Sequence, residues 1–575
     1  MYLRKCRKTI GKTNYVYWQL VESQRTAKGP RQQVVAYLGD MHEALRLGVA
    51  EAATANRVRQ PGMLNEQVLA EWVDIDVSRV RVERVVDFGA YWLGVQIMEQ
   101  LGLPGVLDSK MKAGREDIPW SVMTAVLVLT RLIDPSSELR IAEHLFERTA
   151  LADLFSIPAE KINDDRLYRT LDQVLPHKNA LEKHLKERLG QMFKLEYDLL
   201  LFDITSTYFE GACQKNKEAR FGYSRDKRSD CKQVCIALVV SREGIPLGYE
   251  LFAGNRKDAS TVEEIITKID DQYGRAGRIW VMDRGMVTEK TLAVLQSEGR
   301  RYIVGTPRGL LRQYQTELSS EEGWQEITES LSAKLIGAEQ DQERFVLCRS
   351  VARGEKEKAM LERFEQKLEE GLQKLAIGCS GKRRVREETM QRRIGALQTK
   401  NSRAKSLFKI KVGVREDGGA KVEWEKLEHQ AKWAALKSGC YVLRTNVAGT
   451  VEELWRNYMQ LTEAEAAFRI QKNDLRIRPI WHQKQERVAA HILVCFLAYV
   501  LWKTLAQMCK AARIGNEPRK VIDELAGIRM VDVVLPTRNG VQLRRRCISE
   551  PTEAQAILLE RLKLRLPRSE NVQPV

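Results

Sequence analysis

The stretch between Tyr197 and Gly305 constrains the fold more than any other part of the chain, because short apolar runs alternate there with helix-forming segments. The runs have the length of strands, and the order is strand, strand, strand, helix, strand, helix, strand. The expected strands are 199–202, 234–240, 246–252, 279–282 and 302–305, and the expected helices are 259–273 and 288–297. This order predicts an α/β core in which three antiparallel strands are followed by parallel ones.

Helical segments precede this core. Residues 119–194 have a helical pattern that is broken at Pro135, Pro158 and Pro176, because proline cannot continue a helix and restricts the residue before it. The region is compatible with a helix-turn-helix in which 164–175 is one helix. A plain helical bundle explains the same pattern equally well.

Residues 310–440 interrupt the core on its C-terminal side. They contain a charged amphipathic helix over 354–375 and a basic helical segment over 382–406. A strand at 439–444 and a long helical region over 451–502 are expected next.

Both ends of the chain carry an expected β-hairpin. At the N-terminus, strands begin at Tyr15 and Val34, and residues 1–35 hold eight Lys or Arg against one Glu. This basic hairpin is either a solvated edge that keeps strands from aggregating or an arm that contacts phosphates. At the C-terminus, Asn539-Gly540 is the expected turn of a hairpin whose second strand carries three arginines at 544–546.

The net charge indicates the class of partner. The chain of 575 residues has 94 Lys and Arg against 77 Asp and Glu, which gives a formal net charge of +17. Such an excess implies a polyanionic partner, and nucleic acid is the commonest one.

Composition argues against a membrane or secreted protein. The longest apolar runs, 122–130 and 492–502, are far shorter than the ~20 residues of a bilayer span, and the second indicates a buried core helix. The ten cysteines are scattered, with only Cys231 and Cys235 close together. The basic N-terminus leads into no apolar signal segment. We therefore expect reduced, mostly buried cysteines, no membrane contact and a cytoplasmic location.

Two aspartates directly follow expected strands. Asp203 comes after 199–202 and Asp283 after 279–282, and ligands bind at the carboxyl edge of an α/β sheet. Neighbouring carboxylates repel each other unless cations lie between them. Mg²⁺ prefers such oxygen ligands, and two ions ~3.5–4 Å apart can promote phosphoryl transfer. Taken alone, each aspartate is more simply a strand-end or turn residue.

A third acid, Glu465, lies in the long helical region. Helical spacing aligns it with Arg469, Lys472 and Arg476, so a metal-binding carboxylate would be followed by cations suited to phosphates. The same segment allows two structural interpretations. Thr462 and Glu465 have the spacing of a capping box, and Glu465 with Arg469 forms an ordinary i,i+4 pair worth ~0.2–0.5 kcal/mol.

Taken together, these motifs resemble the bacterial insertion-sequence transposases of the Asp-Asp-Glu (DDE) class, which have a ribonuclease H-like core. The segment DITSTYFEG resembles the first-aspartate strand of that family, and VMDRGM resembles its second. Tyr458, Glu465 and Lys472 match its tyrosine–arginine–glutamate–lysine signature, with Leu461 at the arginine position. Three further segments resemble family motifs: GYSRDKRSDCKQ, AGNRKDAS and RPIWHQKQERVAAHI. The resemblance covers residues 195–505.

The resemblance implies an α/β fold with a ribonuclease H-like catalytic core, which is interrupted by an insertion domain and extended by an N-terminal hairpin and helical regions. It implies that Asp203, Asp283 and Glu465 are catalytic and bind two Mg²⁺ ions, for which Mn²⁺ can substitute. The enzyme would cleave DNA at the ends of an insertion sequence and transfer the strands into target DNA. The residues expected to contact DNA are Tyr458, Lys472, Arg469, Arg284 and Arg478. For the last two, a structural ion pair is the simpler explanation.

The corresponding domain division has six parts. They are a basic N-terminal region with a β-hairpin (1–110), a helical region expected to bind DNA (111–195), the first part of the ribonuclease H-like core (196–309), an insertion domain (310–440), the second part of the core (441–510) and a C-terminal region (511–575). The expected partners are double-stranded DNA, as terminal repeats and as target, and a second copy of the chain on that DNA. The expected location is the bacterial cytoplasm, at the nucleoid.

Two other functions fit the same residues. A ribonuclease H-like nuclease would use the three acids without strand transfer, and joined target products would distinguish the two enzymes. A DNA-binding regulator derived from a transposase would have a decayed site, and the intact set of acids argues against it.

Overall fold

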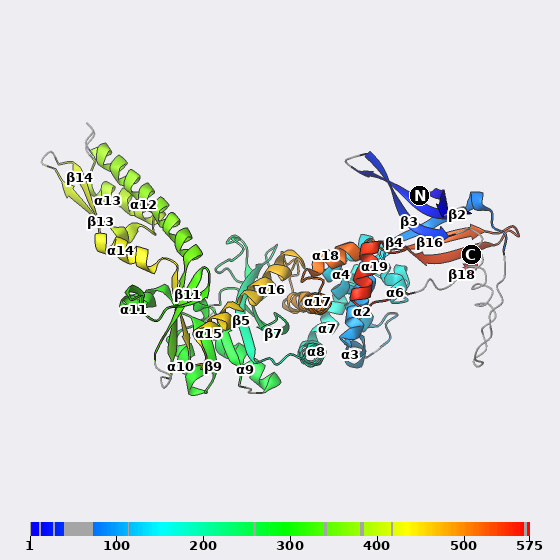
Figure 1. Ribbon diagram of the computed structural model, residues 1–575, viewed down its shortest axis with the longest axis horizontal. Coiled ribbons are helices and arrows are strands. Elements are labelled where there is room, and N and C mark those ends of the chain that lie inside the picture. The colour runs from blue at the N-terminus through cyan, green and yellow to red at the C-terminus, as the bar shows by residue number, and fades with distance from the viewer. Residues whose placement is uncertain are drawn as a thin grey trace.

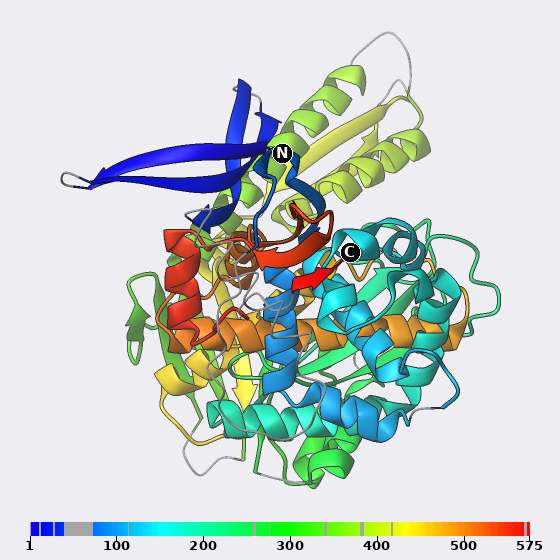
Figure 2. The same ribbon diagram turned by 90° about the vertical axis from the view of Figure 1, so that its right-hand side faces the viewer.

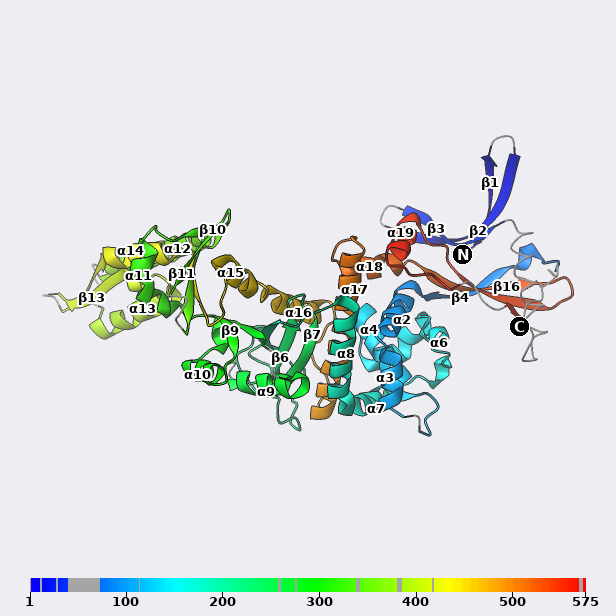
Figure 3. The ribbon, with the colours of Figure 1, turned by 60° about the horizontal axis from the view of Figure 1, so that its bottom comes forward.

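The computed structural model describes residues 2–10, 13–26, 29–39, 73–112, 114–256, 260–274, 277–337, 342–379, 385–415, 418–567 and 572–574, with the backbone alone for 2–39 and 572–574. The molecule is elongated (Figure 1). A unit of helices and two strands lies at one end, followed by a large sheet, a helical bundle and the strands near both termini. Figure 3 shows the same row from another side, and Figure 2 looks along it from the end with the termini.

A nine-stranded sheet forms the centre of the molecule, with the strand order β10-β11-β12-β15-β9-β8-β5-β6-β7. The strands at one end of this order are β9 (Arg301–Gly305), β8 (Ile279–Met282), β5 (Leu199–Tyr208), β6 (Gln233–Ser241) and β7 (Pro246–Ala253). The first three in the chain, β5 to β7, pair antiparallel, whereas β8 pairs in parallel with both β5 and β9. This confirms the predicted order of three antiparallel strands followed by parallel ones.

Both faces of these strands are buried, which explains why their sequences are apolar runs rather than alternating patterns. Phe202 of β5 packs on one face with the crossover helices α9 (Val262–Tyr273) and α10 (Glu289–Ser297). Leu201 lies on the other face, in the same core as the helical bundle and α16 (Thr462–Asn473).

Further strands extend the sheet beyond β9. They are β15 (Cys440–Thr445), β12 (Arg344–Ser350), β11 (Leu331–Ile336) and β10 (Gln325–Thr328). The interruption predicted over 310–440 therefore has two parts. The residues up to β12 widen the sheet, and only those between β12 and β15 leave it.

The residues that leave the sheet form a unit with its own hydrophobic core. Its elements are α12 (Val351–Cys379), α13 (Glu387–Lys400), β13 (Phe408–Val414), β14 (Ala420–Lys426) and α14 (Glu428–Lys437). Leu368 and Leu372 of α12 are buried together with Met390 and Ile394 of α13. Figure 1 shows this unit, here called the projecting unit, standing out from the end of the sheet.

A helical bundle covers the other end. Its main helices are α2 (Gly89–Gln100), α4 (Trp120–Ile133), α7 (Asp164–Val174), α8 (Lys178–Phe193) and α17 (Gln485–Ala511). By length and composition α17 could cross a membrane, because the helix extends well beyond the apolar run at 492–502. However, 94% of its apolar window is buried inside the molecule, so it is the core helix that the sequence predicts.

The predicted helix at 164–175 is part of this bundle. It corresponds to α7, which packs against α4 and α17. On its outer side, Arg169 pairs with Asp165, and Arg487 pairs with Asp172. A helix whose exposed cations are already paired favours the plain bundle over a DNA-recognition helix.

The helical region predicted over 451–502 consists of three helices. They are α15 (Val451–Met459), α16 and α17. Residues 474–484 are not helical. Pro479 lies in this break, where a proline cannot donate the hydrogen bond that a helix would need.

A second sheet joins one strand from the N-terminal part of the chain, β4, to three strands near the C-terminus. Its strands, in order, are β18 (Val572–Pro574), β17 (Gln542–Ile548), β16 (Arg529–Pro536) and β4 (Arg81–Asp87). The predicted turn lies between β16 and β17, and Gly540 there has a φ of +80°, which favours glycine. Arg544 binds Glu83 and Arg546 binds Asp532, so these arginines stabilise the sheet.

A third, three-stranded sheet lies near the N-terminus. Its strands are β1 (Tyr2–Ile10), β2 (Thr13–Thr26) and β3 (Gly29–Gly39). The antiparallel pairing of β2 with β3 confirms the predicted hairpin. Sequence analysis missed β1, because basic residues rather than alternating apolar ones dominate YLRKCRKTI. Residues 40–72 of the predicted region 1–110 lie outside the described residues.

The cysteines behave as predicted where the structure describes them. Nine cysteines have side chains that the structure describes, and none of these is disulfide-bonded. They are buried, apart from Cys231 and Cys547, which are partly exposed.

Candidate active site

The register of β5 and β8 brings Asp203 and Asp283 to the same edge of the central sheet. Phe202 pairs with Met282, the last residue of β8, so Asp203 is the next residue of β5 and Asp283 directly follows the end of β8. The sequence predicts that Asp203 ends its strand, which is wrong. The strand continues and Asp203 pairs with Leu238, because β6 supplies a partner beyond the point where β8 ends.

Glu465 approaches this edge from α16. Side chains alternate along a strand, so Asp203 points to the face that also carries Leu201. On that face α16 packs through Ala464 and Ala467, which belong to the same core as Leu201. Glu465 lies between these two alanines in the chain, on the exposed side of the helix.

The three carboxylates influence one another electrostatically. Burial is the main cause that raises the pKa of Asp203 to about 7, and the charges of Glu465 and Asp283 act in the same direction. The Ile204 N–H, which donates to Asp203 at 2.7 Å, and the charge of Arg225 oppose the shift. Asp203 is partly buried, whereas Asp283 and Glu465 are exposed.

This set of donors fits a divalent cation. Mg²⁺ prefers carboxylate oxygens, and a cation among the three groups would offset their repulsion. The three carboxylates do not all lie within 4.8 Å of one another, since the one group in the described chain that meets this distance is elsewhere. A cation would therefore bridge acids that do not contact each other directly.

The structural interpretations of Glu465 are not realised. The helix begins at Thr462 without a side-chain cap, and the Thr462 hydroxyl donates to Met459 O at 2.8 Å, so no capping box forms. Among the described residues, no ion pair joins Glu465 to Arg469. The predicted alignment of cations with Glu465 along one helix stops at Lys472. The helix α16 ends before Arg476, whose φ of +46° is not helical.

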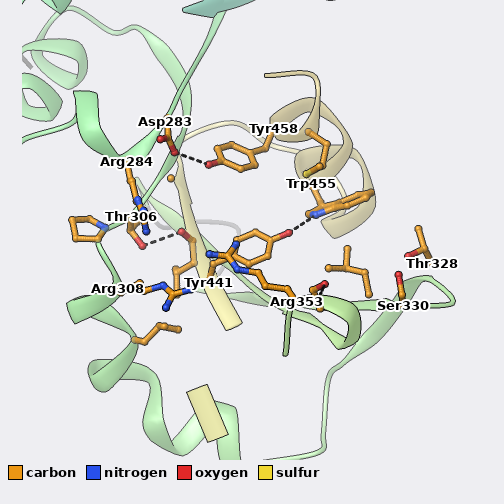
Figure 4. A pocket seen from close by; sticks show the side chains of 17 residues that line it. Asp283, Arg284, Thr306, Arg308, Thr328, Ser330, Arg353, Tyr441, Trp455 and Tyr458 are labelled. Carbon is orange, nitrogen blue, oxygen red and sulfur yellow. Dashed lines mark hydrogen bonds between the residues drawn. The ribbon is translucent and has the colours of Figure 1, made fainter. Parts of the chain in front are cut away.

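Tyr458 of α15 contacts Asp283 directly. Its hydroxyl donates to Asp283 Oδ1 at 3.4 Å (Figure 4). Burial, followed by the charge of Asp283, raises the pKa of Tyr458 well above its ordinary value. Gly305 makes room for this contact, because a Cβ there would lie 2.6 Å from the Tyr458 hydroxyl oxygen. Tyr458 therefore orients Asp283.

Lys472 and Arg478 both bind one buried acid, Asp226, in the loop between β5 and β6. Lys472 Nζ lies 3.0 Å from Asp226 Oδ1, and Arg478 binds the same oxygen. The Asp226 side chain is 5% exposed, and its other oxygen has no hydrogen-bond partner among the described residues. Burial lowers the pKa of Lys472, and Asp226 opposes that shift. The structural ion pair expected for Arg478 is present, and Lys472 shares it.

Arg284 and Arg469 are exposed beside the acids. Arg284 follows Asp283 directly, and Arg469 lies one turn after Glu465 on α16. In the part of the chain that the structure describes, neither arginine has an ion pair. The structural ion pair expected for Arg284 is therefore not found there.

Two glycines let a pair of loops meet beside the site. A Cβ on Gly222 would lie 2.0 Å from Gly254 O, and a Cβ on Gly254 would lie 2.0 Å from Gln233 O. The Gln233 amide joins the loops, since its Nε2 donates to Tyr223 O at 3.0 Å and to Gly254 O at 2.9 Å. These residues come from GYSRDKRSDCKQ and AGNRKDAS, so both motifs hold the loop that carries Asp226.

Sequence analysis missed one cluster, where the bundle meets the segment between α16 and α17. Glu138, His482 and His491 each bring one potential ligand atom within 4.8 Å of the others. Glu138 Oε1 lies 3.3 Å from His482 Nε2, and His491 Nε2 lies 3.2 Å from Ile477 O. The positive charge of Arg131 also acts on His491 and opposes a bound cation. We therefore interpret the cluster as a structural link.

Burial is the largest influence on the pKa values of His491 and Glu138 in this cluster. It lowers the pKa of His491 to about 3, and the charges of Arg131 and His482 act in the same direction. Burial alone would raise the pKa of Glu138, but the hydrogen bond and charge of His482 outweigh it and lower the pKa to about 2. Because its members are far apart in the sequence, no local spacing could have revealed the cluster.

Two family models match parts of the chain. Residues 194–501 match the family model of the transposase DDE domain, and residues 3–60 match the N-terminal domain of IS1634 family transposases. The first match spans more than half of the chain and coincides with the predicted resemblance over 195–505. The chain belongs to the DDE-domain transposase family, as an insertion-sequence transposase that catalyses DNA transposition. Membership implies DNA binding and the use of a divalent metal, generally Mg²⁺.

Among solved structures, a piggyBac transposase synaptic complex with hairpin DNA is similar to this chain at 8% sequence identity. The similarity covers 76% of this chain and 78% of that one, with a TM-score of 0.35, which is too low to support an argument. No curated protein matches the chain.

Proposed function

We propose that Asp203, Asp283 and Glu465 form the catalytic centre of a ribonuclease H-like core. The register that aligns Asp203 with Asp283, with Glu465 close enough to raise the pKa of Asp203, carries the proposal. The central order β7-β6-β5-β8-β9, in which antiparallel strands lead into parallel ones, supports the type of core.

In the proposed reaction, water attacks the phosphate at the end of the element, the bond to the 3′ oxygen breaks, and a free 3′-OH remains. This 3′-OH then attacks a phosphate of the target DNA and displaces the 3′ oxygen of the target strand, so the end of the element becomes joined to the 5′-phosphate side of the break. Two Mg²⁺ ions held by the three carboxylates, or Mn²⁺ in their place, would supply activation of the attacking oxygen and stabilisation of the leaving one. Tyr458 holds the Asp283 carboxylate in one orientation. The helix α16 places Glu465 on the face of the sheet toward which the Asp203 side chain points.

The predicted DNA contacts divide into two groups. Arg284 and Arg469 are exposed beside the acids and are proposed to contact the DNA backbone. Lys472 and Arg478 act through Asp226, which fixes the loop after β5. Tyr458 binds Asp283 and is therefore proposed to lie near the scissile phosphate, where it also contacts the DNA backbone.

The remaining proposals concern assembly. The enzyme binds its terminal repeats and its target as a homodimer, since cleavage at two ends requires them to be paired. The domain division 1–110, 111–195, 196–309, 310–440, 441–510 and 511–575 is retained, with the projecting unit as the insertion. The enzyme acts in the bacterial cytoplasm, at the nucleoid.

The test uses the full-length protein and a plasmid that carries the DNA flanking the gene. Cleavage is mapped at nucleotide resolution in Mg²⁺ and in EDTA, for the wild type and for Asp283→Asn. Paired breaks at inverted repeats that need both the metal and Asp283 are expected, together with joined target products. The matched control is Asp108→Asn, an exposed acid on α3 (Leu103–Lys110), which leaves cleavage intact.

Other outcomes would overturn parts of the proposal. Breaks without joined products would indicate a nuclease, and specific binding without breaks would indicate a regulator. Undiminished cleavage by Asp283→Asn would remove that residue from the catalytic centre.

A further inference from the structure

Two adjoining hollows lead from the acidic edge of the sheet to the projecting unit. The first, of about 470 Å³, is lined by Asp283 and Tyr458 among others. The second, of about 610 Å³, is lined largely by α12, α14 and the loops beside them. Arg284, Arg308 and Arg353 line both hollows, so the two form one continuous cleft. Figure 4 shows Arg284 and Arg308 on the side of the first hollow away from Trp455, and Arg353 beside Tyr441. We refer to the whole as the basic cleft.

Cations dominate the lining of the second hollow. They come from the sheet edge, from α12, from the turn that follows α13 and from α14. They are Arg284, Arg308, Arg353, Lys356, Arg403 and Lys437. Glu357 is the acid among the residues that line it. The junction between the sheet and the projecting unit is therefore positively charged.

Glu357 organises two of these arginines rather than neutralising the cleft. Its carboxylate binds Arg308 and accepts from Arg353 Nε at 3.0 Å, and its second oxygen accepts from Gly439 N–H at 3.0 Å. Arg353 also lies over the ring of Tyr441, with 5.2 Å between its guanidinium carbon and the ring centroid. The single negative charge of Glu357 offsets only one of the two positive charges. The pair of guanidinium groups therefore keeps a net positive charge and a fixed position.

The other cations of the cleft are exposed, and the charges of nearby arginines act on one of them, Lys437. Burial lowers the pKa of Lys437, and the like charges of Arg308 and Arg312 add to that shift. Lys356 and Arg403 have no ion pair among the described residues. Crowded cations repel each other, and a polyanion that spans them relieves this repulsion while its own counterions are released.

We propose that the basic cleft binds the phosphodiester backbone of DNA next to the phosphate that is cut. Lys356, Arg403 and Lys437 contact the backbone, and Arg308 and Arg353 are positioning residues held by Glu357. Such contacts fix the orientation of the duplex and read no sequence. The inference rests on the proposed function, because Asp283 at one end of the cleft marks the position of the reacting phosphate.

The experiment measures the salt dependence of DNA binding by the full-length protein in EDTA, where no cleavage occurs. The triple variant Lys356→Gln, Arg403→Gln, Lys437→Gln removes the three exposed cations. The slope of log K against log salt scales as ~0.9 per phosphate contact, so it is expected to become shallower by about 2–3.

The matched control changes three exposed lysines of the projecting unit that do not line the cleft, one each on α12, α13 and α14, as Lys358→Gln, Lys400→Gln and Lys432→Gln. This control removes the same charge from the same unit and is expected to keep the wild-type slope. Equal slopes for the two triple variants would overturn the proposal, as would a cleft variant with the wild-type slope.

Two DNA substrates distinguish the source of the backbone. One is a duplex that contains the end of the element with its flanking DNA, and the other is an unrelated duplex of equal length. A change of slope on the first alone assigns the cleft to the DNA being excised, and a change on the second alone assigns it to target DNA. The Asp283→Asn variant is expected to keep the wild-type slope of log K against log salt on both duplexes. The cleavage assay therefore tests the catalytic role of Asp283, and the binding slope tests the cleft separately.

Discussion

Asp226 holds Lys472 of α16 at 3.0 Å, and this contact ties together the two elements that carry the acids. Asp226 lies in the loop that follows β5, the strand of Asp203, and Lys472 lies two turns after Glu465. Because Arg478 binds the same carboxylate, three segments meet at one buried charge. The distance between Asp203 and Glu465 therefore depends on an ion pair outside the set of acids.

The first prediction concerns this ion pair. Asp226→Asn leaves the partly buried cations Lys472 and Arg478 without a counter-charge, and breaking a buried pair costs about 3–5 kcal/mol. We expect a loss toward the lower end of that range, because Arg478 keeps 27% of its side chain exposed. The measurement is denaturant unfolding, accompanied by the rate of DNA cleavage, which falls as Glu465 moves.

The matched control is Asp230→Asn in the same loop. Asp230 is exposed and binds Arg228 at the surface, where water screens an ion pair so strongly that its loss changes stability little. Equal stability of the two variants would show that Asp226 is no anchor for the site.

The second prediction concerns metal removal. Mg²⁺ binding to the folded protein alone stabilises it, by ~2.7 kcal/mol when the ion is present at 100 times its Kd. We expect Mg²⁺ to raise the melting temperature of the wild type and EDTA to reverse the effect. Asp203→Asn and Glu465→Gln should each lose most of the shift, since three carboxylates hold the metal. A full shift in both variants would place the metal elsewhere.

The third prediction concerns Tyr458 and Gly305. Tyr458→Phe removes a long hydrogen bond to Asp283, worth about 1 kcal/mol, so the single-turnover cleavage rate should fall about fivefold. Gly305→Ala pushes the Tyr458 hydroxyl away and should reproduce that loss. The double variant should lose little more than either single one, because both act on one contact. Additive losses would show that the two residues act separately.

Sequence predicted the centre of the fold well and its extensions poorly. The strand 279–282 was predicted with its observed bounds, because a short apolar run buried on both faces has a distinct composition. The strands β10 to β12 were missed, although β11 and β12 hold several apolar residues and pair with each other locally. They join the central sheet only through β12, whose partner β15 comes much later in the chain. Strand pairing across such distances has no local signal.

The candidate site shows the same limit. Asp203 and Asp283 could be found because each follows an apolar strand, but their common edge depends on the parallel register of those strands. Sequence could not show that Lys472 and Arg478 share Asp226, because that pairing needs the loop fold set by Gly222 and Gly254. The roles of the cations were therefore harder to predict than the positions of the acids.

The last prediction concerns pH and the link formed by Glu138, His482 and His491. The pKa of His491 is about 3 in the folded protein, against an ordinary value of 6.5. Between these values the unfolded chain binds one more proton than the folded one, so stability falls as the pH drops below 6.5, by up to about 1.4 kcal/mol per pH unit. The pKa of Glu138 is lowered to about 2 from 4.5, so its contribution is present above pH 4.5 and is lost only below it.

Urea unfolding at pH 7.5, 6.5 and 5.5 isolates the histidine, because the contribution of Glu138 is constant over that range. Arg131 is permanently charged and faces the same link, so it adds no proton uptake of its own. We expect the loss between pH 6.5 and 5.5 to be much smaller in His491→Gln than in the wild type. His144→Gln, which changes a histidine whose side chain is 72% exposed, should keep the wild-type loss. If His491→Gln retained that loss as well, the acid sensitivity would arise from groups other than the buried imidazole.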